Sequence, residues 1–188
     1  MKLKLMTYIA AIILTSTPAL ASVSVLENTK YYKFFESDPT NVIRKTKKSV
    51  SGVCTNSGHA SACTKIKNTY KVGKIRKSGK LCKVKRFSIK LKVTYHLPKW
   101  KNVSLANPKI RDEWNKLYSN IVKHEKTHKE IHKKQFDKAY REILKLKVSC
   151  NTINNSIKSI INHYSKESIK ENQKFDLKNK VNFRFFSK

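Results

Sequence analysis

Apolar side chains recur at intervals of three and four residues from Asn107 to about Val148, a pattern that predicts one long amphipathic helix. Asn107 is a favourable N-cap residue, and Pro108 fits the first helical position because its missing N–H needs no partner there. At about 1.5 Å per residue this helix approaches about 60 Å in length, so a break before Trp114 or near Lys133 is also compatible with the pattern. The apolar stripe consists of Trp114, Leu117, Tyr118, Ile121, Val122, Ile131, Phe136, Ala139, Tyr140, Ile143 and Leu146.

A second stretch of helical periodicity, with fewer apolar residues, runs over residues 151–173. The link between the two predicted helices, residues 149–151, leaves room only for a tight reversal of the chain. The two helices are therefore expected to be antiparallel neighbours.

The first half of the chain has the two-residue alternation of strands. The clearest strand spans residues 87–97, where apolar side chains alternate with Ser, Lys, Thr and His, and Pro98 is expected to end its pairing. Weaker patterns predict strands over 23–35, 40–53 and 65–75. These elements predict an α+β fold in which an N-terminal antiparallel sheet packs on the long helix and its antiparallel neighbour.

Residues 1–21 have the features of a secretory signal peptide. Lys2 and Lys4 precede an apolar run over 8–14, and Ala19-Leu20-Ala21 forms a small-x-small cleavage site. That run is about half of the roughly 20 residues that span a bilayer, and no later segment is apolar enough to do so. We expect one soluble domain over 22–188, exported to the periplasm or the medium, with a strand-rich part (22–98), a helical part (107–173) and a tail (174–188).

Export would place the four cysteines in an oxidising compartment, which favours disulfides over free thiols. Four cysteines allow three pairings. The favoured one joins Cys54 with Cys63, across a loop containing Gly and Ser, and Cys82 with Cys150. Buried free thiols are the alternative.

The chain is strongly basic, with 42 Lys and Arg against 12 Asp and Glu, and a formal net charge of +30. Such a charge attracts anionic surfaces in a salt-sensitive way that does not depend on sequence. Six of the basic residues are Arg, the side chain best suited to reading bases, so specific nucleic-acid recognition is not expected. Non-specific contact with an anionic envelope surface fits the charge, although an AT-rich genome would produce the same excess of Lys.

Within the long helix, His124-Glu125-Lys126-Thr127-His128 matches the His-Glu-x-x-His arrangement of zinc peptidases. Residues four apart lie one helical turn apart, about 6 Å, so both imidazoles can bind one Zn²⁺ at about 2.0–2.1 Å. Glu125 lies about 100° around the axis, beside the metal, where it can take a proton from a water whose pKa the metal lowers to roughly 7. The pattern predicts one Zn²⁺ per chain, with Glu125 as the catalytic base. The plainer alternative is that these side chains satisfy one another on a solvated seam.

A zinc site of this kind needs a third protein ligand. In the antiparallel helix pair, residues about 20 before the link face residues about 20 after it. His132 lies about 12 Å along the axis from His124, and His163 faces about residue 138, so neither is expected to share the ion. Asp176 and Glu171 are the leading candidates, and the sequence leaves the choice open. The acidic residues that the count brings near the histidines are Glu167, Glu171 and Asp176.

Several motifs follow one another in a fixed order from Cys82 to Leu146: Cys-x-Val at 82–84, the alternating strand, Leu97-Pro98-x-Trp100, Trp114-x-x-x-Tyr118 and His124-Glu125-x-x-His128. In this order they resemble a bacterial family of unknown function described as predicted secreted zinc-dependent proteases. The resemblance implies a zincin-like fold, zinc ligation by the two histidines and catalysis by the glutamate. The chain departs from the family at Thr127, where relatives often have Gly. It also departs at Asn179 and Val181, which replace the Thr and His of an Asp-x-x-Thr-x-His-Gly-like segment beginning at Asp176.

Together these patterns predict an exported zinc metallopeptidase that hydrolyses peptide bonds in a peptide or protein substrate. The alternative is a degenerate, non-catalytic basic protein of the envelope that binds anionic surfaces. A chelator would abolish activity of the first kind, whereas rising salt would abolish binding of the second kind.

Overall fold

The strand β3, Leu81–Trp100, is the centre of a four-stranded sheet in a computed structural model that describes residues 23–37, 41–42, 44–45 and 61–179. β3 pairs antiparallel with β2 (Cys63–Ser78) and β4 (Lys147–Ser149), and parallel with β1 (Val23–Phe34). The predicted α+β class is confirmed, but the prediction of a wholly antiparallel sheet is wrong for β1. Residues 35–62, which connect β1 to β2, are numerous enough to carry the chain from one edge of the sheet to the other.

The alternation predicted over residues 87–97 is confirmed, because Ile89, Leu91 and Val93 are buried while the lysines between them are exposed. β3 does not end at Pro98, as predicted, but continues to Trp100. Pairing with β2 stops at His96, so among the described strands β3 is bordered beyond that residue by β1, and a missing N–H is tolerated there.

A further correction concerns the predicted strand over 40–53. Asn41, Val42, Arg44 and Lys45 are helical. Pro39 precedes them in the sequence, and proline favours the first turn of a helix. The rest of that predicted strand lies outside the described residues.

A short 3-10 helix, Val103–Leu105, leads into helix α2, Pro108–Lys145, which is continuous. The Asn107 side chain accepts a hydrogen bond from the Ile110 N–H at 2.9 Å, which confirms the predicted N-cap. Neither of the breaks that the sequence left open occurs, because α2 keeps buried residues on its apolar stripe from Trp114 to Ile143. Helix α3, Ile153–Lys178, runs beyond the predicted end at residue 173, so the predicted tail begins as helix.

α2 ends at Lys145, earlier than predicted, because the residues that follow form β4 against the start of β3. The Cys82–Cys150 disulfide joins the same two segments, with the Cα atoms 4.8 Å apart, and confirms that predicted pairing. Cys63 is also disulfide-bonded, and its predicted partner, Cys54, lies outside the described residues. The sheet is thus covalently tied to the link between the two helices.

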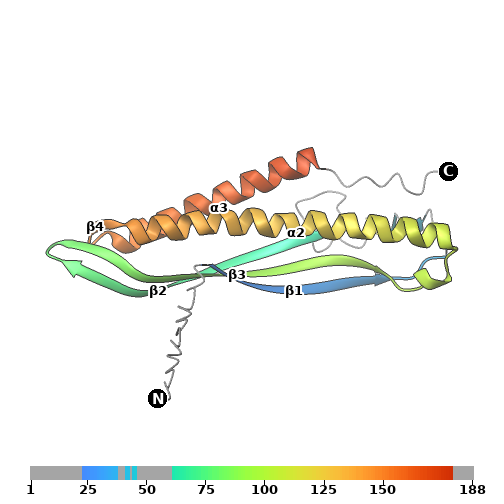
Figure 1. Cartoon of the computed structure of the whole chain (residues 1–188), viewed down its shortest axis with the longest axis horizontal. Helices are drawn as coiled ribbons and strands as arrows, with labels where there is room; N and C mark the ends of the chain where they lie inside the picture. Colours follow the sequence, from blue (N-terminus) through green and yellow to red (C-terminus); the bar gives the residue numbers. More distant parts are fainter. Residues whose placement is uncertain (1–22, 38–40, 43, 46–60, 180–188) are drawn as a thin grey trace, which may run out of the picture.

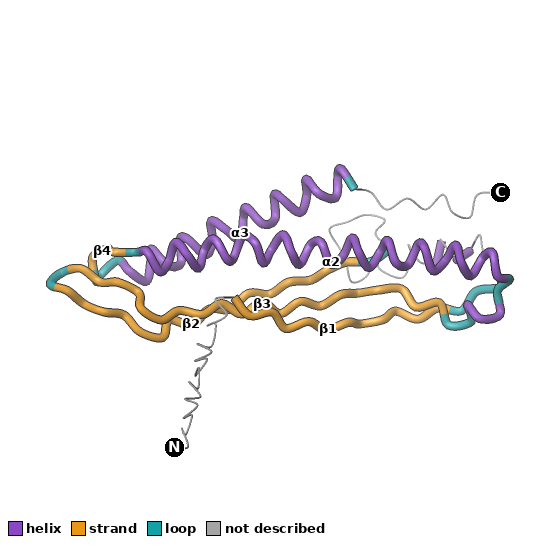
Figure 2. Tube along the Cα trace, viewed as in Figure 1, coloured by secondary structure: helices purple, strands orange, loops and turns teal. Residues whose placement is uncertain are grey.

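Both helices lie on one side of the sheet, with α2 next to the strands and α3 beside α2 (Figures 1 and 2). Two apolar clusters fill the space under α2. Near the link, Phe136, Ala139 and Ile143 pack with residues of α3 and β3. Toward the other end of α2, Trp114, Leu117 and Ile121 pack with residues of β1 and β3. The segment of α2 between Ile121 and Phe136 carries the His-Glu-x-x-His motif.

The predicted signal peptide, residues 1–21, lies outside the described residues. Among the helices that are described, none combines the length and the hydrophobicity needed to cross a bilayer.

We expect Ile143→Ala to destabilise the fold by about 2–5 kcal/mol, because Ile143 is 0% exposed in the cluster that joins α2, α3 and β3. The matched control is Ile169→Ala, since Ile169 on α3 is 51% exposed. Urea unfolding of both variants measures the difference. Equal stabilities would contradict the packing described for this cluster.

Candidate metal centre

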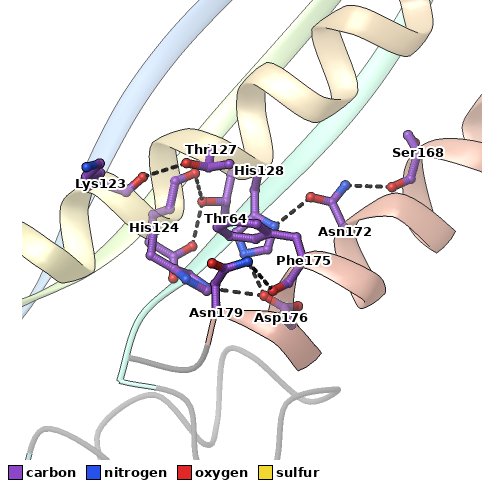
Figure 3. A network of polar contacts seen from close by, with 11 residues as sticks. Thr64, Lys123, His124, Thr127, His128, Ser168, Asn172, Phe175, Asp176 and Asn179 are labelled. Carbon is purple, nitrogen blue, oxygen red and sulfur yellow. Dashed lines mark hydrogen bonds and ion pairs between the residues drawn. The ribbon is translucent and has the colours of Figure 1, made fainter. Parts of the chain in front are cut away.

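The two histidines of the motif lie side by side on α2. Helical spacing stacks His124 and His128 one turn apart, and their ring centroids are separated by 4.9 Å. Both side chains point toward the last turns of α3 (Figure 3). Each is largely buried, with side chains about one-seventh exposed. The helix therefore presents two imidazoles to the same small volume.

Asp176 on α3 is the acidic residue that meets them. Its Oδ1 atom lies 3.1 Å from Nε2 of His124 and 3.1 Å from Nε2 of His128. The three possible ligand atoms all lie within 4.8 Å of one another. His124 and Asp176 are each 26 residues from Cys150, so the antiparallel count made from the sequence identifies the correct part of α3.

The structure separates Asp176 from the other acidic candidates. Glu171 lies five residues before Asp176, about 140° around the helix axis, and Glu167 lies nine residues before it, on the opposite side. Glu167 pairs with Lys170 at 2.8 Å. Neither glutamate belongs to the group that could hold an ion, as far as the described residues show.

The two other histidines considered from the sequence also lie outside this group. His163 is exposed and packs edge-on against Tyr164, at 4.9 Å between ring centroids. His132 is one turn beyond His128, and burial lowers its pKa to about 4. Among the described residues, the group that could hold an ion includes neither of them.

Asn172 determines which nitrogen of His128 faces Asp176. The Asn172 amide donates to the Ser168 carbonyl at 2.7 Å, which leaves its Oδ1 atom to accept the Nδ1–H of His128 at 2.6 Å. In neutral His128 the proton is then on Nδ1, and Nε2 carries a lone pair. Figure 3 shows this chain of contacts from Ser168 to His128.

A lone pair and a carboxylate oxygen at 3.1 Å repel each other unless a proton or a metal ion lies between them. A metal ion satisfies this requirement for both histidines at once. Donors bonded to one tetrahedral ion at about 2.0–2.1 Å lie roughly 3.3 Å apart, close to the two separations between histidine nitrogens and Asp176 seen here. Two imidazole nitrogens and one carboxylate oxygen also form the donor set of catalytic zinc sites, which leave a fourth position open. The residues present therefore fit a zinc ion.

Glu125 lies next to these three residues and is 5% exposed. The Thr64 hydroxyl on β2 is 2.7 Å from Glu125 Oε2 and orients the carboxylate. Burial raises the pKa of Glu125, and the hydrogen bond from Thr64 and the charge of His128 oppose that rise. The carboxylate is thus held beside the histidines rather than between them, as expected for residues one apart on a helix.

The rings of both histidines contact Phe175, at 4.8 Å and 5.3 Å between centroids. Because Phe175 belongs to α3, this helix supplies an apolar wall of the centre.

The surroundings of His124 favour its neutral form. Burial is the largest cause that lowers the pKa of His124, followed by the charge of His128, so the neutral ring that a metal requires is favoured. A backbone hydrogen bond at Asn179 also holds the ring.

Sequence reasoning missed three residues of the centre, Asn172, Phe175 and Thr64. Asn172 lies four residues before the predicted ligand Asp176 on α3, and this spacing is a signal that could have linked the two. Phe175 could have been inferred only after its neighbour was assigned. Thr64 has no local signal, because its contact with Glu125 depends on how β2 packs under α2.

The fold and this donor set define an α+β domain with a candidate metal centre between two helices and the sheet. Residues 29–182 match the model of a bacterial protein family of unknown function (DUF922), and the chain belongs to that family. No curated protein and no solved structure gives a significant match.

We expect Asn172→Ala to weaken binding of a transition-metal ion by about 10–100-fold, because His128 loses the partner that fixes its tautomer and orientation. Asn155→Ala, an exposed position on the same helix, is the matched control. Competition titration with a chromogenic chelator gives both affinities. An unchanged affinity for the Asn172 variant would show that this hydrogen bond does not orient a ligand.

Proposed function

We propose that this chain is an exported zinc-dependent peptidase. The observation that carries the proposal is the convergence of His124, His128 and Asp176 on one point, with the buried carboxylate of Glu125 beside it. Three protein donors and an adjacent base are the minimum that hydrolysis by a mononuclear zinc site requires. The resemblance to predicted secreted zinc-dependent proteases supports the same reading of these residues.

When bound, zinc supplies a Lewis acid for the scissile carbonyl and lowers the pKa of water to about 7. The protein supplies the remaining chemistry. Glu125 accepts the proton of the attacking water and returns it to the leaving amine. Thr64 keeps the carboxylate oriented between these two transfers through its hydrogen bond to Oε2. Asp176 and Asn172 keep the two imidazoles pointing at one position.

The proposed export rests on two features. The first 21 residues have the composition of a signal peptide. The disulfide between Cys82 and Cys150 belongs to the oxidising compartments outside the cytoplasm. The peptidase is therefore proposed to act in the periplasm or the medium on a peptide or protein substrate.

Purified chain is expected to contain one zinc per molecule by elemental mass spectrometry. His124→Ala and His128→Ala remove ligands and should abolish retention, whereas His163→Ala, on an exposed histidine, should not. Asp176→Ala should weaken zinc binding by more than the roughly 10–100-fold that loss of an outer hydrogen-bond partner causes. Glu171→Ala is its matched control. Zinc retained after both histidine substitutions would place the ion elsewhere.

Glu125→Gln is expected to lower kcat/KM on a broad peptide library by about 10²–10⁴-fold while zinc content stays at one per chain, because the amide cannot accept a proton. Glu130→Gln, an exposed glutamate on the same helix, should keep full activity. Activity of the Glu125 variant equal to wild type would exclude Glu125 as the base. A chain that binds zinc but cleaves no peptide, wild type included, would favour the non-catalytic alternative, in which salt-sensitive binding to anionic surfaces is the function.

A further inference from the structure

The hairpin formed by β2 and β3 carries an unusual distribution of charge. Residues 63–100 contain 13 Lys and Arg and no Asp or Glu. All 13 basic side chains are exposed. None of them makes an ion pair with any residue that the structure describes. Within the part of the chain that the structure describes, the positive charge of this region is therefore not compensated by ion pairs.

The strand register places many of these charges directly opposite one another. Lys67 pairs with Lys92, Lys74 with Arg86, and Arg76 with Lys83. On the other side of β3, Lys33 of β1 pairs with Lys99. Like charges at directly opposite positions destabilise a sheet. An anionic partner on this surface would remove that repulsion.

The charged surface and the helices lie on opposite sides of the sheet. Leu91 and Val93 are 0% exposed in the clusters packed under α2. Because side chains alternate along a strand, Lys90 and Lys92 point away from α2. Figure 1 shows both helices on one side of the strands. We call the opposite surface of β2 and β3 the basic sheet face, and it includes Lys65, Lys67, Lys71, Lys90 and Lys92.

We propose that the basic sheet face docks on a lipid bilayer rich in anionic phospholipid headgroups, leaving the metal centre on the side away from the membrane. A strand of 16 residues extends about 50 Å at 3.3 Å per residue, so the face offers a long, broad surface and not a pocket. Eleven of the 13 basic residues over 63–100 are Lys, compact point charges suited to single headgroups, whereas reading nucleic acid favours Arg. Leu26, paired with Lys92, adds an apolar side chain that is 49% exposed.

The test uses the chain from residue 22 onward with vesicles of phosphatidylcholine alone or mixed with phosphatidylglycerol. A quadruple variant removes four charges of the basic sheet face: Lys67→Gln, Lys71→Gln, Lys90→Gln and Lys92→Gln. The matched control removes four charges from exposed positions on the helices: Lys109→Gln, Lys116→Gln, Lys158→Gln and Lys166→Gln. Zinc content and circular dichroism of both variants show whether the fold is kept.

Co-sedimentation should show binding to the mixed vesicles, none to phosphatidylcholine alone, and loss of binding as salt rises. Each Lys near an anionic membrane contributes roughly a fivefold gain in partition coefficient, so the sheet variant should bind at least about a hundredfold more weakly than the helix control. Equal weakening of the two variants would overturn the proposal, because net charge alone would then explain binding. Binding to DNA or to an acidic polysaccharide but not to the mixed vesicles would also overturn it. The outcome does not depend on peptidase activity.

Discussion

The packing of α3 against α2 is the contact on which the candidate metal centre depends. α2 alone supplies two imidazoles, one donor fewer than the protein contributes to a catalytic zinc site. The third donor, Asp176, lies near the far end of α3, so it reaches the histidines only if the helices remain antiparallel over most of their shared length. The Cys82–Cys150 disulfide fixes the link end of this pair to the sheet, and buried isoleucines of α3 maintain the contact beyond it.

Local patterns in the sequence were sufficient for both long helices, for strands β1 to β3, and for His124, Glu125 and His128 of the centre, but not for β4 or the helical residues near Val42. Three-and-four spacing predicts α2 with its N-cap at Asn107, and two-residue alternation predicts the middle of β3. His124 and His128 follow from their spacing alone, since neighbours on one helix need no tertiary information. The parallel pairing of β1 was not predictable in this way, because it joins segments far apart in the sequence, such as Val23 and Ile89.

The choice between Asp176 and Glu171 shows the limit of what counting residues along the sequence can predict. The antiparallel count fixes distance along α3 but not rotation about its axis, and the two carboxylates differ by about 140° in rotation. Packing fixes that rotation. Ser168, fully buried, marks the side of α3 that faces α2, and Asn172 follows one turn later with its bond to His128. A small polar residue within a charged helix is a sign of close helix contact, but the sequence does not show which helix it contacts.

A candidate metal centre within a chain of net charge +30 is contradictory only if charge is averaged over the molecule. At physiological ionic strength, exposed charges are screened beyond about 8 Å, so the nearest groups decide local affinity. Asp176 and Glu125 are the acidic groups at the centre, whereas the 13 basic side chains of residues 63–100 are exposed to solvent. Leu91 and Val93 are buried between Lys90, Lys92 and α2. The sheet thus lies between the charge of its basic face and the side chains that could bind a metal ion. Replacing lysines of the basic sheet face should therefore leave metal binding at the candidate centre unchanged.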